Sequence, residues 1–120
     1  MKDKLYTYRA KIIDVYDGDT FTVQIDLGFK VTLTDKVRLY GIDTPEIRTK
    51  DKEEKKRGYT ARKYLLDMVL GHDCLVKTHK QEKYGRILAD VTIVEDGVEI
   101  DLATEMIKNG HGKAYFGGKR

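Results

Sequence analysis

The chain has 120 residues, 40% of them apolar and 36% charged, and 23 Lys and Arg against 20 Asp and Glu give a net charge of +3. This length predicts one domain over residues 1–120, and the apolar share excludes a disordered chain. The single cysteine, Cys74, excludes an intrachain disulfide and a cysteine zinc site. No apolar run approaches the roughly 20 residues of a membrane helix and no signal peptide is visible, so we expect a cytoplasmic protein without a membrane partner.

The first third of the chain is expected to form three strands. Residues 8–15 form the first, which the Asp17-Gly18 turn signal joins to the second. Apolar residues alternate with polar ones through the second and third strands, which predicts a sheet with one buried face. The apolar positions are Phe21, Val23, Ile25 and Leu27, then, after a turn at Gly28, Phe29, Val31, Leu33, Val37 and Leu39.

The rest of the chain alternates between helix and strand signals. Residues 48–56 are expected to form an exposed, charged loop, and residues 58–70 a helix with apolar Ala61, Leu65, Met68 and Val69. Strands are predicted at 74–78 and 87–94, a turn at Asp96-Gly97, and a short helix from the capping Asp101 to Gly110. Residues 117–120 are expected to form a flexible basic tail.

This order of elements predicts a mainly β α+β fold. Three strands, a helix, two strands and a short helix are typical of a five-stranded Greek-key barrel of the OB type. The first helix would lie between strands three and four, and the short helix would be C-terminal. An open α+β sandwich is the alternative.

Three polar clusters lie at strand ends or in loops, and each has an ordinary structural explanation. Asp17-Gly18-Asp19-Thr20 is a hairpin turn signal, and Lys83-Tyr84-Gly85-Arg86 fits an exposed turn. Between them, Arg38 is followed by Gly41-Ile42-Asp43-Thr44-Pro45-Glu46, where the spacing of Asp43 and Glu46 also fits a helix capping box.

Taken together, the clusters hold the groups that phosphodiester hydrolysis needs. Asp19 and Asp43 could bind a hard divalent cation, and Glu46 could accept a proton from water. Arg38 and Arg86 could grip a phosphate and neutralise its transition-state charge.

With these clusters in this order, the sequence resembles the staphylococcal nuclease family. The segments Asn109-Gly110 and Lys113-Ala114-Tyr115 resemble the end region of that family, so the similarity spans roughly residues 8–116. The resemblance implies an OB-type barrel and Ca²⁺-dependent cleavage of DNA and RNA that leaves 3′-phosphate ends. We expect a monomer that prefers single strands. The alternative is a catalytically inactive OB-fold module that only binds nucleic acid.

The resemblance also implies roles for individual residues. Asp19, Asp43 and the carbonyl of Thr44 would hold Ca²⁺, with Asp17 supporting them. Arg38 and Arg86 would hold the scissile phosphate, Glu46 would be the general base, and Lys83, Tyr84 and Tyr115 would line the nucleotide pocket. The chain departs from the family prototype at its end, where Phe116 and Gly117 replace a second pocket tyrosine and a further helix is missing.

Overall fold

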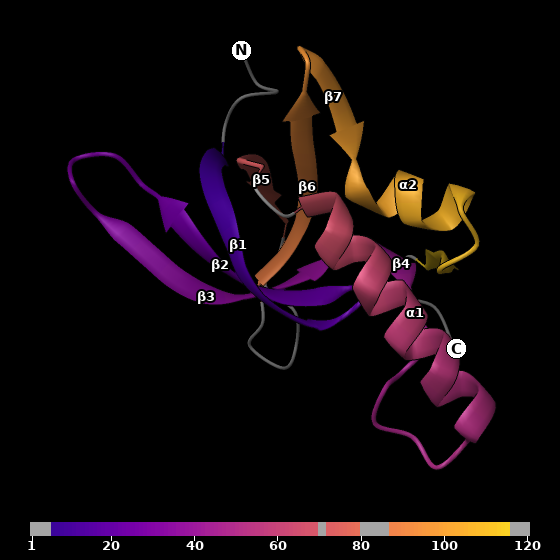
Figure 1. Ribbon diagram of the computed structural model, residues 1–120. Coiled ribbons are helices and arrows are strands. Elements are labelled where there is room, and N and C mark those ends of the chain that lie inside the picture. Colours follow the sequence, from indigo (N-terminus) through magenta and orange to yellow (C-terminus); the bar gives the residue numbers. More distant parts are fainter. Residues whose placement is uncertain (1–5, 70–71, 80–86, 116–120) are drawn as a thin grey trace.

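The computed structural model describes residues 6–69, 72–79 and 87–115. Within these ranges the chain forms eight strands and two helices (Figure 1). The elements are β1 (Thr7–Asp17), β2 (Thr20–Asp26), β3 (Thr32–Leu39), β4 (Gly41–Asp43), α1 (Lys52–Val69), β5 (Cys74–Thr78), β6 (Ile87–Glu95), β7 (Val98–Asp101), α2 (Leu102–Lys108) and β8 (Lys113–Tyr115).

Five strands close into a barrel. Neighbours pair antiparallel in the order β3-β2-β1-β5-β6, and a parallel pairing of β3 with β6 completes the ring. β7 extends the sheet beyond β6, while β4 pairs separately with β8. The prediction of a five-stranded OB-type barrel is therefore confirmed, with α1 between the third and fourth barrel strands. Closure through β3 and β6 rules out the open sandwich.

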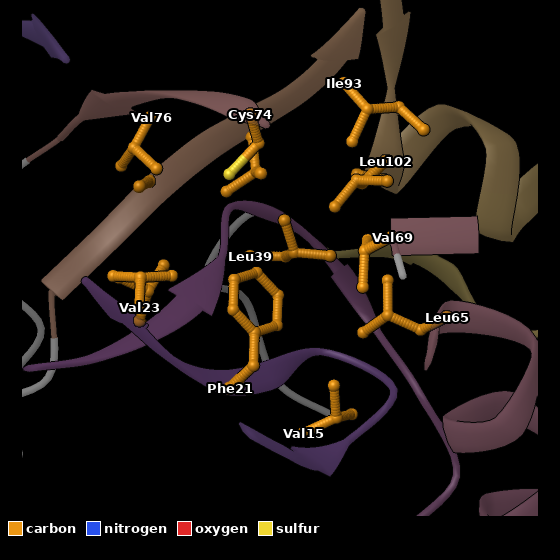
Figure 2. Packing of buried hydrophobic residues seen from close by; sticks show 14 of the residues in the cluster. Val15, Phe21, Val23, Leu39, Leu65, Val69, Cys74, Val76, Ile93 and Leu102 are labelled. Carbon is orange, nitrogen blue, oxygen red and sulfur yellow. The ribbon is translucent and has the colours of Figure 1, made fainter. Parts of the chain in front are cut away.

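The alternating apolar residues fill the barrel, and both helices contribute to the same core. Phe21 and Val23 of β2 are almost completely buried. Figure 2 shows Leu65 of α1 and Leu102 of α2 against the strand residues, so each helix closes part of the barrel. Burial raises the pKa of the Cys74 thiol in this core to about 12. Neither helix of the described residues is long and apolar enough to cross a membrane.

The prediction that the buried face continues to the end of the β2–β3 hairpin is wrong. Leu27, Phe29, Val31 and Leu33 are exposed, and Phe29 is 98% exposed. The pairing of β1 with β2 ends at Ile25, so the hairpin beyond that point has no neighbouring strand and projects from the barrel (Figure 1). Alternation alone does not say whether another layer covers a strand.

The first helix begins earlier than predicted. Residues 52–56, expected in an exposed charged loop, form the first turns of α1. The helix is capped by Asp51, whose Oδ1 accepts hydrogen bonds from the backbone N–H groups of Glu53 and Glu54 at 3.0 and 3.3 Å. The capping-box interpretation of Asp43 and Glu46 is therefore wrong, because the helix starts nine residues after Asp43 in chain order and has its own cap.

Candidate active site

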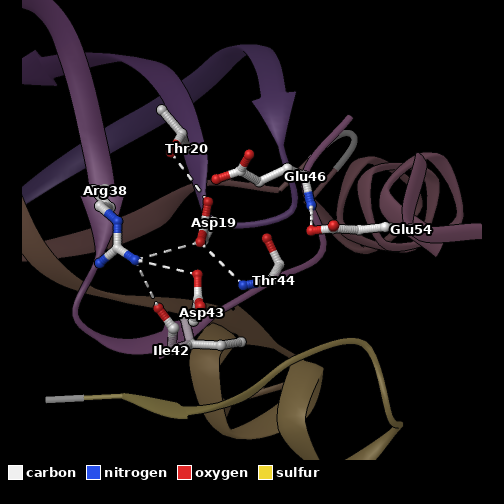
Figure 3. A network of polar contacts seen from close by, with 8 residues as sticks. All are labelled: Asp19, Thr20, Arg38, Ile42, Asp43, Thr44, Glu46 and Glu54. Carbon is white, nitrogen blue, oxygen red and sulfur yellow. Dashed lines mark hydrogen bonds and ion pairs between the residues drawn. The ribbon is translucent and has the colours of Figure 1, made fainter. Parts of the chain in front are cut away.

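The first two polar clusters meet at one end of the β2–β3 hairpin. Thr20 pairs with Arg38 in the register of β2 and β3, which brings the β1–β2 turn beside the end of β3. The backbone N–H of Leu39 donates to the carbonyl of Asp19 at 2.8 Å and fixes this arrangement. β4 follows directly and places Asp43 and Thr44 next to Asp19 (Figure 3).

The Arg38 guanidinium lies at the centre of this cluster. Its Nη2 is 3.6 Å from Asp19 Oδ2 and 3.8 Å from Asp43 Oδ1, and it donates to the carbonyl of Ile42 at 3.2 Å. Arg38 is only 7% exposed and Asp19 6%, so the charges interact where water screens them little. The guanidinium also lies 5.7 Å from the centre of the Tyr115 ring. One cation thus faces two carboxylates and an aromatic ring.

The oxygen atoms around Asp19 and Thr44 suit a hard cation. Asp19 Oδ2 accepts from the Thr44 backbone N–H at 3.2 Å, and Oδ1 accepts from the Thr20 hydroxyl at 3.1 Å. The Thr44 hydroxyl is buried and finds no hydrogen-bond partner within the described part of the chain. There, no three His, Cys, Asp or Glu side chains form a metal cluster. Two carboxylates, a backbone carbonyl and water remain a fitting set for Ca²⁺, which takes six to eight oxygen ligands.

Asp17 is half-buried at the end of β1, two residues before Asp19. Burial first, and then the negative charge of Asp19, raise the pKa of the Asp17 carboxyl above its usual value. The backbone N–H of Ile47 acts in the opposite direction and lowers the pKa of this carboxyl. The charge of Glu46 is a further influence that raises this pKa, so Asp17 lies near the loop that carries Glu46.

Helix α1 holds Glu46 in place. The Glu46 backbone N–H donates to Glu54 Oε2 at 3.2 Å (Figure 3). A Cβ atom at Gly58 would lie 2.9 Å from the carbonyl carbon and oxygen of Glu46, closer than real Cβ contacts come. Only glycine at position 58 therefore lets α1 approach the Glu46 backbone this closely. Glu46 itself remains exposed.

Both helices also press on the turn that carries Asp19. A Cβ at Gly18 would lie 3.0 Å from Ala61 Cβ of α1 and 3.1 Å from Met106 Cε of α2. It would also lie 3.2 Å from the Thr44 methyl group. The packing of the helices thus fixes the position of the metal-ligand candidates.

The structure brings together seven of the predicted site residues, namely Asp17, Asp19, Arg38, Asp43, Thr44, Glu46 and Tyr115. Lys83, Tyr84 and Arg86 lie outside the described residues, as does the tail. Sequence reasoning missed the contributions of Glu54 and Gly58, because neither belongs to a recognisable motif. A pocket opens beside Pro45, and Lys56 and Arg57 of α1 line it.

Comparison with known proteins now identifies the family. The family model described as "Staphylococcal nuclease homologue" matches residues 36–120. The chain belongs to the staphylococcal nuclease family. It is 35% identical over 81 residues to the probable endonuclease LCL3 of Yarrowia lipolytica, covering 68% of this chain and 36% of that protein.

A second relative is an uncharacterised protein of Methanocaldococcus jannaschii. It is 28% identical over 129 aligned residues, which cover 91% of this chain and 60% of that protein. The chain thus spans only part of the length of both curated relatives. Family membership supports nuclease activity in general.

Proposed function

We propose that this chain is a Ca²⁺-dependent endonuclease that hydrolyses phosphodiester bonds of DNA and RNA. It acts as a monomer, prefers single strands and leaves 3′-phosphate ends. The observation that carries the proposal is the buried Arg38 guanidinium facing Asp19 and Asp43, with the backbone of nearby Glu46 held by Glu54 of α1. These groups all come from one chain, and membership in the nuclease family supports the same reading.

Arg38 and the proposed second arginine, Arg86, bind the scissile phosphate. A guanidinium presents paired donors that match phosphate oxygens, and its charge stabilises the negative charge that grows in the transition state. Loss of one such donor typically costs roughly 10²–10³ in rate. The contacts of Arg38 with Ile42, Asp19 and Asp43 hold it in place before substrate arrives.

Glu46 acts as the general base. Its carboxylate takes a proton from water as the water oxygen forms a bond to phosphorus. The bond between phosphorus and the 5′ oxygen breaks, and that oxygen takes a proton from solvent. The products are a 3′-phosphate and a 5′-hydroxyl. Glu54 accepts a hydrogen bond from the Glu46 backbone N–H, so the base keeps its position.

Asp19, Asp43 and the Thr44 carbonyl would hold Ca²⁺. When bound, this ion supplies positive charge beside a phosphate oxygen. Tyr115, together with the proposed contacts of Lys83 and Tyr84, binds the nucleoside next to the phosphate. The aromatic ring beside Arg38 supports a single-stranded substrate, since only an unstacked base can offer its face to a tyrosine.

The proposal is tested by digestion of a fluorescent single-stranded DNA with Ca²⁺, with Mg²⁺ and with EDTA. We expect Ca²⁺-dependent cleavage, and a fragment mobility that changes on phosphatase treatment shows the 3′-phosphate. Glu46→Gln should lower turnover by about 10²–10⁴. The matched control Glu99→Gln changes an exposed carboxylate on β7 and should leave turnover unchanged.

Arg38 is tested with the lysine variant because its side chain is buried between two carboxylates. Arg38→Ala would leave both charges uncompensated and destabilise the fold. Arg38→Lys retains the charge and loses the paired donors, so it should fold and turn over slowly. Tight DNA binding without cleavage under any metal would contradict the proposal and favour a binding module.

A further inference from the structure

Two cations meet on the ring of Tyr16, beside the candidate active site. Lys36 Nζ lies 5.9 Å from the centre of the ring, and Arg48 Cζ lies 5.2 Å from it. The three side chains come from separate segments: Tyr16 from β1, Lys36 from β3 and Arg48 from the loop after Glu46. The Tyr16 side chain is 43% exposed, so this cluster lies at the surface.

The cations of this cluster form no close ion pair in the described residues, although the charge of Arg48 lowers the pKa of the nearby Asp17 carboxyl. Neither Lys36 nor Arg48 makes an ion pair with an acidic residue of the described ranges, whereas Lys63 on α1 pairs with Asp67 at 3.3 Å. Cation–π contact with Tyr16 holds both cations without cancelling their charge. Two oriented cations at a surface attract an anion.

The cluster also has a defined position relative to the scissile phosphate. Lys36 precedes Arg38 by two residues in an unbroken register with β2, so the two side chains point from the same face of β3. Their Cα atoms are about 7 Å apart, which is roughly the span of one extended nucleotide. Tyr16 adjoins Asp17, and Arg48 follows Glu46 by two residues.

We propose that Lys36 and Arg48, held by Tyr16, bind the backbone phosphate next to the scissile one on a single nucleic-acid strand. This subsite rests on the proposed function, because it takes Arg38 as the site of the scissile phosphate. It would make the enzyme favour polymers over substrates with one phosphate, without reading base identity.

Binding is measured first, because it does not require cleavage. The affinity of the full chain for a fluorescent octathymidylate is followed against salt in EDTA. Each lost phosphate contact lowers the salt slope of a single strand by about 0.7, equivalent to roughly fivefold weaker binding at 0.1 M salt. We expect this change for Lys36→Gln and for Arg48→Gln.

The matched control is Lys30→Gln, which removes the same charge at the far end of the hairpin. Lys30 lies in the turn just before β3, eight residues from Arg38 along the chain. The control should leave the slope unchanged. Tyr16→Phe keeps the ring and should bind as the parent protein does, whereas Tyr16→Leu removes the platform and should weaken binding. The subsite is overturned if the salt slope is unchanged in both Lys36→Gln and Arg48→Gln, or if Lys30→Gln lowers it equally.

Cleavage separates the subsite from the catalytic site. A thymidine carrying one nitrophenyl phosphodiester has the scissile phosphate alone, so Lys36→Gln and Arg48→Gln should cleave it at the parent rate. Their kcat/KM on octathymidylate should fall about fivefold at 0.1 M salt. Equal losses on both substrates would contradict the subsite. If the parent protein cleaves neither substrate, the proposed function fails, and the salt slopes still decide whether the phosphate site exists.

Discussion

Gly58 gives the sharpest test of how α1 positions Glu46. In an exposed helix interior, replacing glycine with alanine stabilises a protein by about 1 kcal/mol. Here the new Cβ would lie 2.9 Å from the Glu46 carbonyl carbon and oxygen and 3.0 Å from Ile47 Cγ1. Overpacking of this kind costs about 1–3 kcal/mol. Gly58→Ala should therefore destabilise the chain by up to about 2 kcal/mol instead of stabilising it.

The same substitution should lower activity. Either the helix or the Glu46 loop must move to admit the Cβ, and a 1 Å displacement of a catalytic group can cost about 100-fold in rate. Urea unfolding gives the free-energy change, and digestion of single-stranded DNA gives the rate. Thr60→Ala is the control, since this exposed residue lies on the same helix and its hydroxyl donates to the Lys56 carbonyl of that helix. A Gly58→Ala protein that is more stable and fully active would refute the reasoning.

Three further predictions concern stability and reactivity. Because the pKa of Asp17 is raised in the fold, its ionisation opposes folding as pH rises through 3.8 and beyond. In EDTA, Asp17→Asn should gain stability over the parent protein from acid toward neutral pH, and a constant difference in urea titrations would contradict this. The Cys74 thiol, with a pKa of about 12, should resist Ellman's reagent at pH 8 until urea unfolds the chain; rapid labelling of the native protein would be the opposing result. Phe29 is exposed and has a φ of 54°, a conformation that asparagine tolerates. In urea titrations, the free energy of unfolding of Phe29→Asn should therefore lie within about 0.5 kcal/mol of the parent value or above it.

The barrel was predictable because its signal is local. Period-two alternation in β2 and β6 marks buried faces, and Asp96-Gly97 and Asp101 mark a turn and a helix start in short segments. The exposed end of the β2–β3 hairpin was not predictable in this way, since burial there depends on where β1 stops pairing. Short strands β4 and β8 carry too few residues for a pattern.

The start of α1 was also not predictable from a local pattern. Its first turns are charged and carry no apolar residue toward the core, so helical periodicity begins only near Gly58. The chemical groups of the site could be recognised in the sequence, because short motifs contain Asp19, Arg38, Asp43 and Glu46. The supports from Glu54 and Gly58 depend on how α1 packs against the loop, and no local pattern encodes that contact.

The most direct test of the account is the rate of single-stranded DNA cleavage in Ca²⁺ and in EDTA, for the parent protein, Glu46→Gln and Glu99→Gln side by side. We expect Ca²⁺-dependent cleavage by the parent and Glu99→Gln proteins, and a rate about 10²–10⁴-fold lower for Glu46→Gln. Cleavage at the parent rate by Glu46→Gln would contradict the general-base role. No cleavage by any of the three proteins would contradict the nuclease proposal itself.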